Sequence, residues 1–242
     1  MKKLRIFLCL LAIIVMCPTA FAQNERETYD VDFKKIEDFV KKQHDQFESQ
    51  MQRFIAGDTT LTLEEIANVF YGSDLSTDYS HEDAPEAMLK AIKNEDFDQA
   101  FELGRAKLEK SPASLDLLLK MMYCCDKLGR DENALNYQTR AFQLIDIILA
   151  SGDGRTCETA FKVVNISDEY TIIFGVFDME FKQQALIWPC DEMTLYANDP
   201  DDEVVLYFDV TLHMNKLNDI FGSSKSSADK KSKGKKGGKK SR

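Results

Sequence analysis

The fold is decided by the stretch ALNYQTRAFQLIDIILASGDG, residues 134–154. Its first part places apolar residues on one helical face, namely Ala134, Tyr137, Ala141, Ile145 and Ile148. This spacing predicts an amphipathic helix. The last four residues, Ser151-Gly152-Asp153-Gly154, are typical of a turn. The hydrophobic pattern is helical before this turn and alternating after it, so the sequence predicts an α+β fold with helices first and a sheet last.

The residues after the turn are expected to form a C-terminal, mostly antiparallel sheet. Short β-rich runs occupy residues 159–164, 170–176, 184–188 and 194–197. A clean alternation over residues 204–213 places these side chains on one face: Val204, Leu206, Phe208, Val210 and Leu212. One apolar face and one mixed face are typical of an antiparallel sheet that packs on helices.

The residues before the turn are expected to form helical hairpins. An apolar stripe predicts one long helix over residues 32–55, with His44 on the stripe as a partly buried histidine. Thr62 and Glu65 have capping-box spacing and predict a shorter helix that stops at Gly72. A polar loop is expected to follow that helix.

The helical pattern just before the turn resembles tetratricopeptide-type repeats. Ala100 and Ala134 are small residues 34 positions apart, and Pro112 closes the first unit. Small residues at matching positions let paired helices approach closely. The match is partial, because Gly104 and Lys107 stand where such repeats usually carry an aromatic and a small residue. Two units bury too little apolar surface alone, so the flanking segments must cap them.

The N-terminal residues have the organisation of a secretory signal peptide. Residues 1–22 combine a basic start, an apolar run and an Ala20-Phe21-Ala22 cleavage site. The run, residues 6–16, is shorter than the roughly 20 residues that span a bilayer. We therefore expect an exported protein, periplasmic or secreted, that is not transmembrane. A lipoprotein is disfavoured, because Met16 stands where a small residue should precede a lipid-modified Cys17.

The chain divides into four segments of different composition. They are the signal peptide at residues 1–22, the tetratricopeptide-like helical region at 23–150, the β region at 151–221 and a Lys/Ser/Gly-rich tail at 222–242. The formal net charge of −10 combines +3 in the signal peptide, −21 in the body and +8 in the tail. The tail is expected to be disordered, because it contains no residue able to anchor a core.

Three interpretations of the acidic body and the basic tail stay open. The acidity can serve solubility, with the tail as a solvated appendage. Alternatively, the tail contacts an anionic surface, with an affinity that falls as salt rises. In the third interpretation the tail docks on a partner. The acidity of the folded body argues against nucleic acid as its partner.

Four cysteines follow the signal peptide. Cys124 and Cys125 are adjacent in an expected helix and are interpreted as small packing residues. Cys157 and Cys190 both lie in the β region. An oxidising compartment favours a disulfide between these two, although spacing alone does not fix the connectivity.

No motif in the sequence supports catalysis. The chain has no GxSxG, HExxH or SxxK string. Gly152-x-Gly154 lacks the third glycine and the following helix of a phosphate-binding loop, and residues 198–203 lack the spacing of an EF-hand. The cysteine spacing fits no zinc pattern, nor do the scattered histidines His44, His81 and His213. We therefore expect no cofactor and no metal, and a non-catalytic protein is favoured over an enzyme.

Several short strings occur in order along roughly residues 31–213. They are RF at 53–54, GDTTLT at 57–62, YG at 71–72, GDG at 152–154, ETA at 158–160, SDEY at 167–170, CD at 190–191 and YFD at 207–209. Together they resemble an uncharacterised family of exported Bacteroidota proteins, domain of unknown function family 4919. The resemblance implies export and helices before a C-terminal sheet, and it implies no activity. It also nominates five interaction candidates: Asp58, Tyr71, Asp168, Glu169 and Asp209.

Two functional hypotheses follow. The first is a non-catalytic exported protein of the cell envelope, whose helical hairpins bind a protein or peptide partner. The alternative is an envelope enzyme or carbohydrate-binding module that uses the carboxylate-rich sheet face, with Trp188 and Tyr207 as stacking platforms. A buried Trp188 would count against the alternative. An open polar cleft shared by Asp168, Glu169 and Asp209 would favour it.

Overall fold

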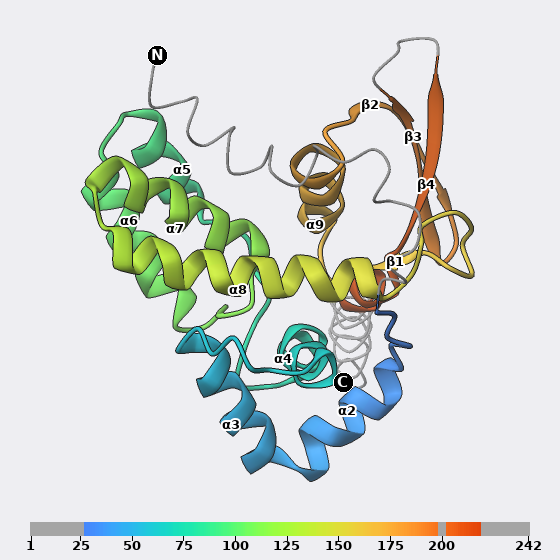
Figure 1. Cartoon of the computed structure of the whole chain (residues 1–242), viewed down its shortest axis with the longest axis horizontal. Coiled ribbons are helices and arrows are strands. Elements are labelled where there is room, and N and C mark those ends of the chain that lie inside the picture. Colours follow the sequence, from blue (N-terminus) through green and yellow to red (C-terminus); the bar gives the residue numbers. More distant parts are fainter. Residues whose placement is uncertain (1–26, 198–201, 219–242) are drawn as a thin grey trace, which may run out of the picture.

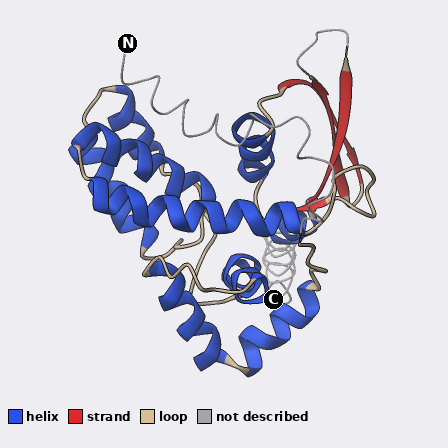
Figure 2. Cartoon of the chain, viewed as in Figure 1, coloured by secondary structure: helices blue, strands red, loops and turns tan. Residues whose placement is uncertain are grey.

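The computed structural model describes residues 27–197 and 202–218. Two groups of helices and a small sheet make up this part of the chain (Figures 1 and 2). The predicted signal peptide and basic tail lie outside the described residues, as does most of the acidic loop at residues 198–203.

The order of the elements is helices first and strands last. The helical part holds α2 (Phe33–Lys42), α3 (His44–Ile55), α4 (Leu63–Leu75), α5 (Glu86–Lys93), α6 (Phe97–Leu108), α7 (Leu115–Leu128) and α8 (Asp131–Ala150). The sheet part holds β1 (Phe161–Lys162), α9 (Ile166–Tyr170), the π-helical η1 (Thr171–Val176), β2 (Glu180–Ile187), β3 (Cys190–Tyr196) and β4 (Glu203–Asp209). Residues 211–218 are helical as well. The predicted α+β class is confirmed.

The long helix α8 runs through the middle of the molecule (Figure 1). It packs on α7, on α4 and on β1. Its buried apolar side chains are Ala141, Leu144, Ile147, Ile148, Leu149 and Ala150. The first helix group, α2 to α4, the second group, α5 to α7, and the sheet therefore all contact this one element.

A polar stripe on α8 holds three backbone carbonyls of the surrounding loops. Side-chain nitrogens donate from Asn136 to Ile55, from Arg140 to Pro112 and from Gln143 to Asp58, over 3.1, 2.6 and 2.8 Å. The donors are three and four positions apart, so they project from one helical face. Because the acceptors lie at the end of α3, just after α3 and after α6, this stripe fixes the two helix groups relative to each other.

The guanidinium of Arg140 is buried at the centre of this stripe. It lies 5.1 Å from the ring centroid of Phe54 and 5.8 Å from that of Tyr137. Burial lowers the pKa of Arg140 to about 10, so the group remains charged at neutral pH. Two aromatic faces, the carbonyl oxygen of Pro112 and Asn136 Oδ1 at 3.4 Å therefore replace much of the water around this cation.

The sheet is mixed, with the strand order β1-β4-β3-β2. β3 pairs antiparallel with β2 and with β4, whereas β1 pairs parallel with β4. Met193 and Leu195 of β3 are buried on the core face, together with Leu206 and Phe208 of β4. This sheet is mostly antiparallel, as predicted, and β2 forms one of its edges.

A disulfide ties the loop after α8 to the sheet. It joins Cys157 to Cys190, the first residue of β3, and this is the pair named from the sequence. The same loop accepts a hydrogen bond at the carbonyl of Gly154 from the amide of Tyr207, over 2.9 Å. The turn that divides the sequence is thus held at two points of the sheet.

The single long helix predicted for residues 32–55 is wrong. The chain forms α2 and α3, which are separated at Gln43, where φ is −126° and ψ is 43°. These angles lie outside the helical region, and the break lets both helices pack on α4. It also moves His44 off the buried stripe, so the ring is exposed.

Gly72 lies inside α4 and does not end it, so the predicted helix end is wrong. A Cβ atom at this position would lie 2.9 Å from Val40 Cγ2 and 3.1 Å from Phe47 Cε2. Val40 belongs to α2 and Phe47 to α3, so the missing side chain lets both helices approach α4 closely. At the start of α4, the predicted capping box of Thr62 and Glu65 is confirmed.

Two predicted strands are partly or wholly helical. Residues 170–176 form the end of α9 and all of η1. The alternating run at residues 204–213 is a strand only as far as Asp209. The helix at residues 211–218 then begins, and Asp209 Oδ1 accepts from the amide of Thr211 over 2.9 Å. This carboxylate caps the helix and marks the end of the strand.

Within the described part of the chain, no helix combines the length and the apolarity that are needed to cross a membrane.

Gly72→Ala is expected to lower the free energy of unfolding by about 1–3 kcal/mol, because its methyl group would crowd Val40 and Phe47. Gly175→Ala is the matched control, since a Cβ atom there would meet only Thr171 Cγ2, at 4.0 Å. Urea unfolding followed by circular dichroism measures both variants. Equal stability of Gly72→Ala and the unmodified protein would contradict the close packing of α2, α3 and α4.

Arg140→Ala is expected to lower the free energy of unfolding by about 2–3 kcal/mol, because it leaves a buried carbonyl without its donor and removes the contact with Phe54. Arg105→Ala, at an exposed position on α6, should change it by less than about 0.5 kcal/mol. Thermal and urea unfolding compare the two variants. A similar small effect at both positions would show that Arg140 and its contacts contribute little to the free energy of unfolding.

Candidate functional site

Buried polar atoms without a hydrogen-bond partner gather around α9. Among the described residues they include both ring nitrogens of His81, Oδ1 of Asp168 and both carboxylate oxygens of Glu169. Asp191 of β3 is buried beside Glu169. We call His81, Asp168, Glu169 and Asp191 the buried cluster. It is the candidate site that the structure presents most clearly, because buried polar groups are normally hydrogen-bonded.

Asp168 is positioned by the start of α9. Its Oδ2 accepts from the amides of Val164 and Asn165, over 3.1 and 2.8 Å, so the carboxylate folds back over the N-terminus of the helix. The residue is almost fully buried, and burial raises its pKa to about 7. Its protonated form is therefore far more populated at neutral pH than that of an exposed aspartate.

His81 faces Asp168 from the loop that precedes α5. Its Nε2 lies 4.0 Å from Asp168 Oδ2, and its ring meets that of Phe70 edge-on at 5.2 Å. Asn165 Nδ2 donates to the carbonyl of His81 over 2.9 Å, which holds the loop against α9. Burial lowers the pKa of His81 to about 3, so the imidazole is neutral at pH 7.

Glu169 and Asp191 form a carboxyl pair between α9 and β3. Burial, with a contribution from Asp191, raises the pKa of Glu169 to about 9. Burial also raises the pKa of Asp191, which accepts from Gln184 Nε2 over 2.6 Å. At neutral pH Glu169 therefore keeps its proton. A protonated Glu169 supplies a donor to Asp191, which two ionised carboxylates could not do.

The buried cluster contains groups that serve in acid–base catalysis elsewhere, but its side chains are closed off from solvent and substrate. Carboxyl groups with raised pKa values serve as general acids where a substrate reaches them. Glu169, Asp168 and His81 are each exposed by 1% or less. The geometry therefore favours a structural role for the cluster, in which protonated carboxyl groups hold α9, β3 and the loop before α5 together.

Three of the five sequence-predicted candidates lie outside this cluster. Tyr71 is fully buried on α4, and its hydroxyl donates to the carbonyl of Lys162 in β1 over 3.0 Å. Burial raises its pKa. Asp209 caps the helix at residues 211–218. Both side chains connect elements of the fold.

Asp58 belongs to a separate network at the start of α4. It accepts from the hydroxyl and the amide of Thr60 and from Arg53 Nε, over 2.7, 2.8 and 2.8 Å. These bonds, the Thr60 hydroxyl first, lower the pKa of Asp58 to about 2. Arg53 also donates to Glu65 of the capping box. The structure thus brings together Asp168 and Glu169 but not the other candidates.

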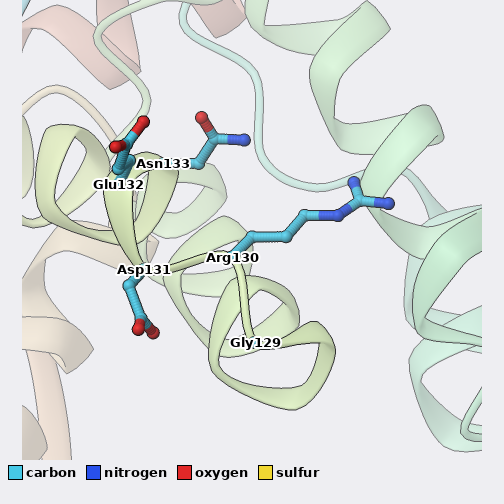
Figure 3. A pocket seen from close by; sticks show the side chains of 5 residues that line it. All are labelled: Gly129, Arg130, Asp131, Glu132 and Asn133. Atoms are coloured by element: carbon cyan, nitrogen blue, oxygen red, sulfur yellow. The ribbon is translucent and has the colours of Figure 1, made fainter.

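A shallow pocket lies at the junction of α7 and α8 (Figure 3). Five consecutive residues line it, Gly129 to Asn133, and the side chains of Arg130, Asp131 and Glu132 point in different directions (Figure 3). Arg130 pairs with Asp98 at 3.0 Å and lies over the ring of Phe101. The pocket follows from the turn between two helices and offers no convergent polar groups.

The sequence interpretation missed His81 and Asp191. His81 lies in a loop expected to be polar, and nothing in its neighbours indicates a buried ring. Asp191 did carry a signal, since it belongs to the CD string at residues 190–191. Strand alternation with Met193 and Leu195 would have placed it on the core face.

A family model described as "Domain of unknown function (DUF4919)" matches residues 34–218. No curated protein and no solved structure matches the chain.

The free energy of unfolding of the unmodified protein is expected to fall between pH 7 and pH 9. In Glu169→Gln this fall is expected to be smaller. The folded-state pKa of Glu169 is raised to about 9, so the folded state binds a proton that the unfolded state has released. Unfolding therefore becomes easier as pH rises, by up to about 1.4 kcal/mol per pH unit. Glutamine resembles the protonated carboxyl and does not titrate.

Urea unfolding at pH 7, 8 and 9 measures this effect, with Glu180→Gln at an exposed position of β2 as the control. Glu169→Gln should become more stable than the unmodified protein at pH 9, whereas the control should follow the unmodified protein. Parallel pH profiles for all three proteins would show that Glu169 is ionised in the folded state.

Proposed function

The chain belongs to the DUF4919 family, whose description names no activity, and we propose from its surface that it is a non-catalytic interaction module that binds an extended polypeptide along β2. The sequence hypothesis places a partner on the helical hairpins. Exposed apolar side chains also lie on the helices, such as Leu135 and Phe142 of α8. Among the described residues, however, the end of β2 and its turn carry three in a row, which favours the sheet edge.

The observation that carries this proposal is the exposure of β2 and the turn after it. Leu186, Ile187 and Trp188 are exposed by 54%, 48% and 58%. Phe181 and Phe174 are exposed as well. Exposed apolar side chains that gather in one region are typical of interaction sites.

The backbone of β2 supports the same proposal. Among the described residues β2 pairs only with β3, so its outer edge has no strand partner, although Tyr170 of α9 packs on Phe181 and donates to Gln184 Oε1 over 3.4 Å. A bulge between Phe181 and Gln183 interrupts one end, and Lys182 there pairs with Glu203. The other end, residues 184–187, keeps a regular register with β3. An added strand would bind at this regular end through main-chain hydrogen bonds.

The charge of the folded body indicates which segments would bind. The body carries a net charge of −21. A strongly acidic peptide would be repelled. The proposed partner is therefore a neutral or basic extended segment with alternating apolar side chains, which fits the exposed Leu186 and Trp188.

One observation still supports the alternative, which is an envelope enzyme or carbohydrate-binding module. Trp188 is exposed and could stack on a sugar ring. However, Asp168 and Glu169 are enclosed, and Asp209 caps a helix. The carboxylates that would have formed an acidic cleft therefore share no open surface with Trp188.

Export to the periplasm or the exterior is part of the proposal. The signal-like organisation of residues 1–22 supports it. The disulfide between Cys157 and Cys190 also supports it, because such bonds persist in oxidising compartments. The tetratricopeptide-like character of the helical region stays a prediction.

Peptide selection tests the proposed binding edge. Phage-displayed peptides are selected on the chain that begins at residue 23, and hydrogen exchange then maps the bound peptide. We expect protection of amides at residues 183–188. We also expect Leu186→Lys to weaken binding at least 10-fold, whereas Leu135→Lys, on exposed α8 surface, should leave it unchanged.

Protection confined to the helices, or equal binding by Leu186→Lys and the unmodified protein, would contradict the proposal. A glycan array is the parallel experiment for the alternative. Retention of a glycan that is lost in Trp188→Ala would favour carbohydrate binding.

A further inference from the structure

Three potential metal ligands meet on the surface between α3 and the loop that follows α4. They are His44 and Glu48 of α3 and Asp78 of the loop. One ligand atom from each residue lies within 4.8 Å of the other two. His44 Nδ1 and Asp78 Oδ2 are 3.9 Å apart.

Helix α3 and the loop after α4 present the three side chains. Because α3 begins at His44, the ring lies in its first turn, and Glu48 lies four positions later on the same face. On the opposite side, the amide of Asp78 donates to Ser76 Oγ over 3.1 Å, which shapes the loop that presents the carboxylate.

Glu48 is held in place by a neighbour of Asp78. Tyr79 donates its hydroxyl to Glu48 Oε2 over 2.8 Å, and its ring meets that of Phe47 edge-on at 6.1 Å. An outer-shell hydrogen bond of this kind orients the carboxylate of many metal sites. The orientation of Glu48 is thus fixed by a side chain outside the ligand set.

The second oxygen of Glu48 has no hydrogen-bond partner among the described residues. This atom, Oε1, is buried. Among the described ion pairs, neither Glu48 nor Asp78 has a lysine or arginine partner, and Asp78 faces only His44. A buried carboxylate oxygen without a donor or a cation is unfavourable. A metal ion bound by the Glu48 carboxylate would supply the positive charge that this group lacks.

We propose that His44, Glu48 and Asp78 bind a divalent transition-metal ion of the zinc type. An imidazole nitrogen with two carboxylate oxygens suits Zn²⁺ better than Ca²⁺ or Mg²⁺, which take oxygen ligands. Zinc bonds of about 2.0–2.2 Å require the ligand atoms to move closer together. His44 and Asp78 have side-chain exposures of 53% and 56%, which leave them room to rotate.

The ion would cross-link α3 to the loop that leads into α5. Three protein ligands leave at least one position for water or for a group from another molecule. The site shares no residue with β2 or with the buried cluster, although Asp78 and His81 lie on the same loop between α4 and α5. Its presence would not depend on the proposed peptide binding.

Calorimetric titration with Zn²⁺ tests the site in the untagged, chelator-treated chain that begins at residue 23. We expect one high-affinity Zn²⁺ per chain. His44→Ala and Asp78→Asn should each weaken binding at least 10-fold without changing the melting temperature of the metal-free protein. Asp45→Asn is the matched control, because Asp45 is exposed beside His44 but outside the ligand set.

Zinc should also raise the melting temperature of the unmodified protein and of Asp45→Asn, but not of His44→Ala. Absence of stoichiometric binding would overturn the proposal. Unchanged Zn²⁺ affinity in His44→Ala would overturn it as well. Ca²⁺ binding that is as tight as Zn²⁺ binding and persists in His44→Ala would replace it with an acidic calcium site.

Discussion

A buried cation without a carboxylate partner governs the arrangement of the helices. Among the described residues, the guanidinium of Arg140 meets the carbonyl of Pro112 and the rings of Phe54 and Tyr137, and no acidic side chain pairs with it. Taking such a charge out of water is unfavourable unless dipoles and aromatic faces replace the water. These groups come from α3, from α8 and from the loop after α6. The desolvation of Arg140 is therefore offset only when all of them are in place, which couples the two helix groups.

Periodicity predicted the order of the elements because it reflects which faces are buried. The turn at residues 151–154, the capping box of α4 and the buried face of β4 all follow from local patterns of this kind. The break at Gln43 has no such signal, because the apolar stripe continues through it. Gly72 was misleading for the same reason. The sequence does not distinguish a glycine that ends a helix from a glycine that lets a neighbouring helix pack closely.

The buried cluster was only partly predictable. The resemblance to the family nominated Asp168 and Glu169, but as surface residues, because acidic side chains are mostly exposed. Their burial depends on α9 and η1, where β-branched residues at 171–173 suggested a strand. His81 becomes part of the cluster only through a contact between loops that are 84 residues apart in the chain, as the bond from Asn165 shows. Contacts over such distances leave no local pattern.

The disulfide between Cys157 and Cys190 closes a covalent ring that contains β1, α9, η1 and β2. A single peptide-bond cleavage inside this ring would not separate the chain into two pieces, since both new ends would remain attached through the sulfur bridge. The exposed turn after β2 is thus tolerant of nicking by proteases. Reduction of the bridge would remove that tolerance, so the persistence of a nicked chain would itself depend on the redox state of its surroundings.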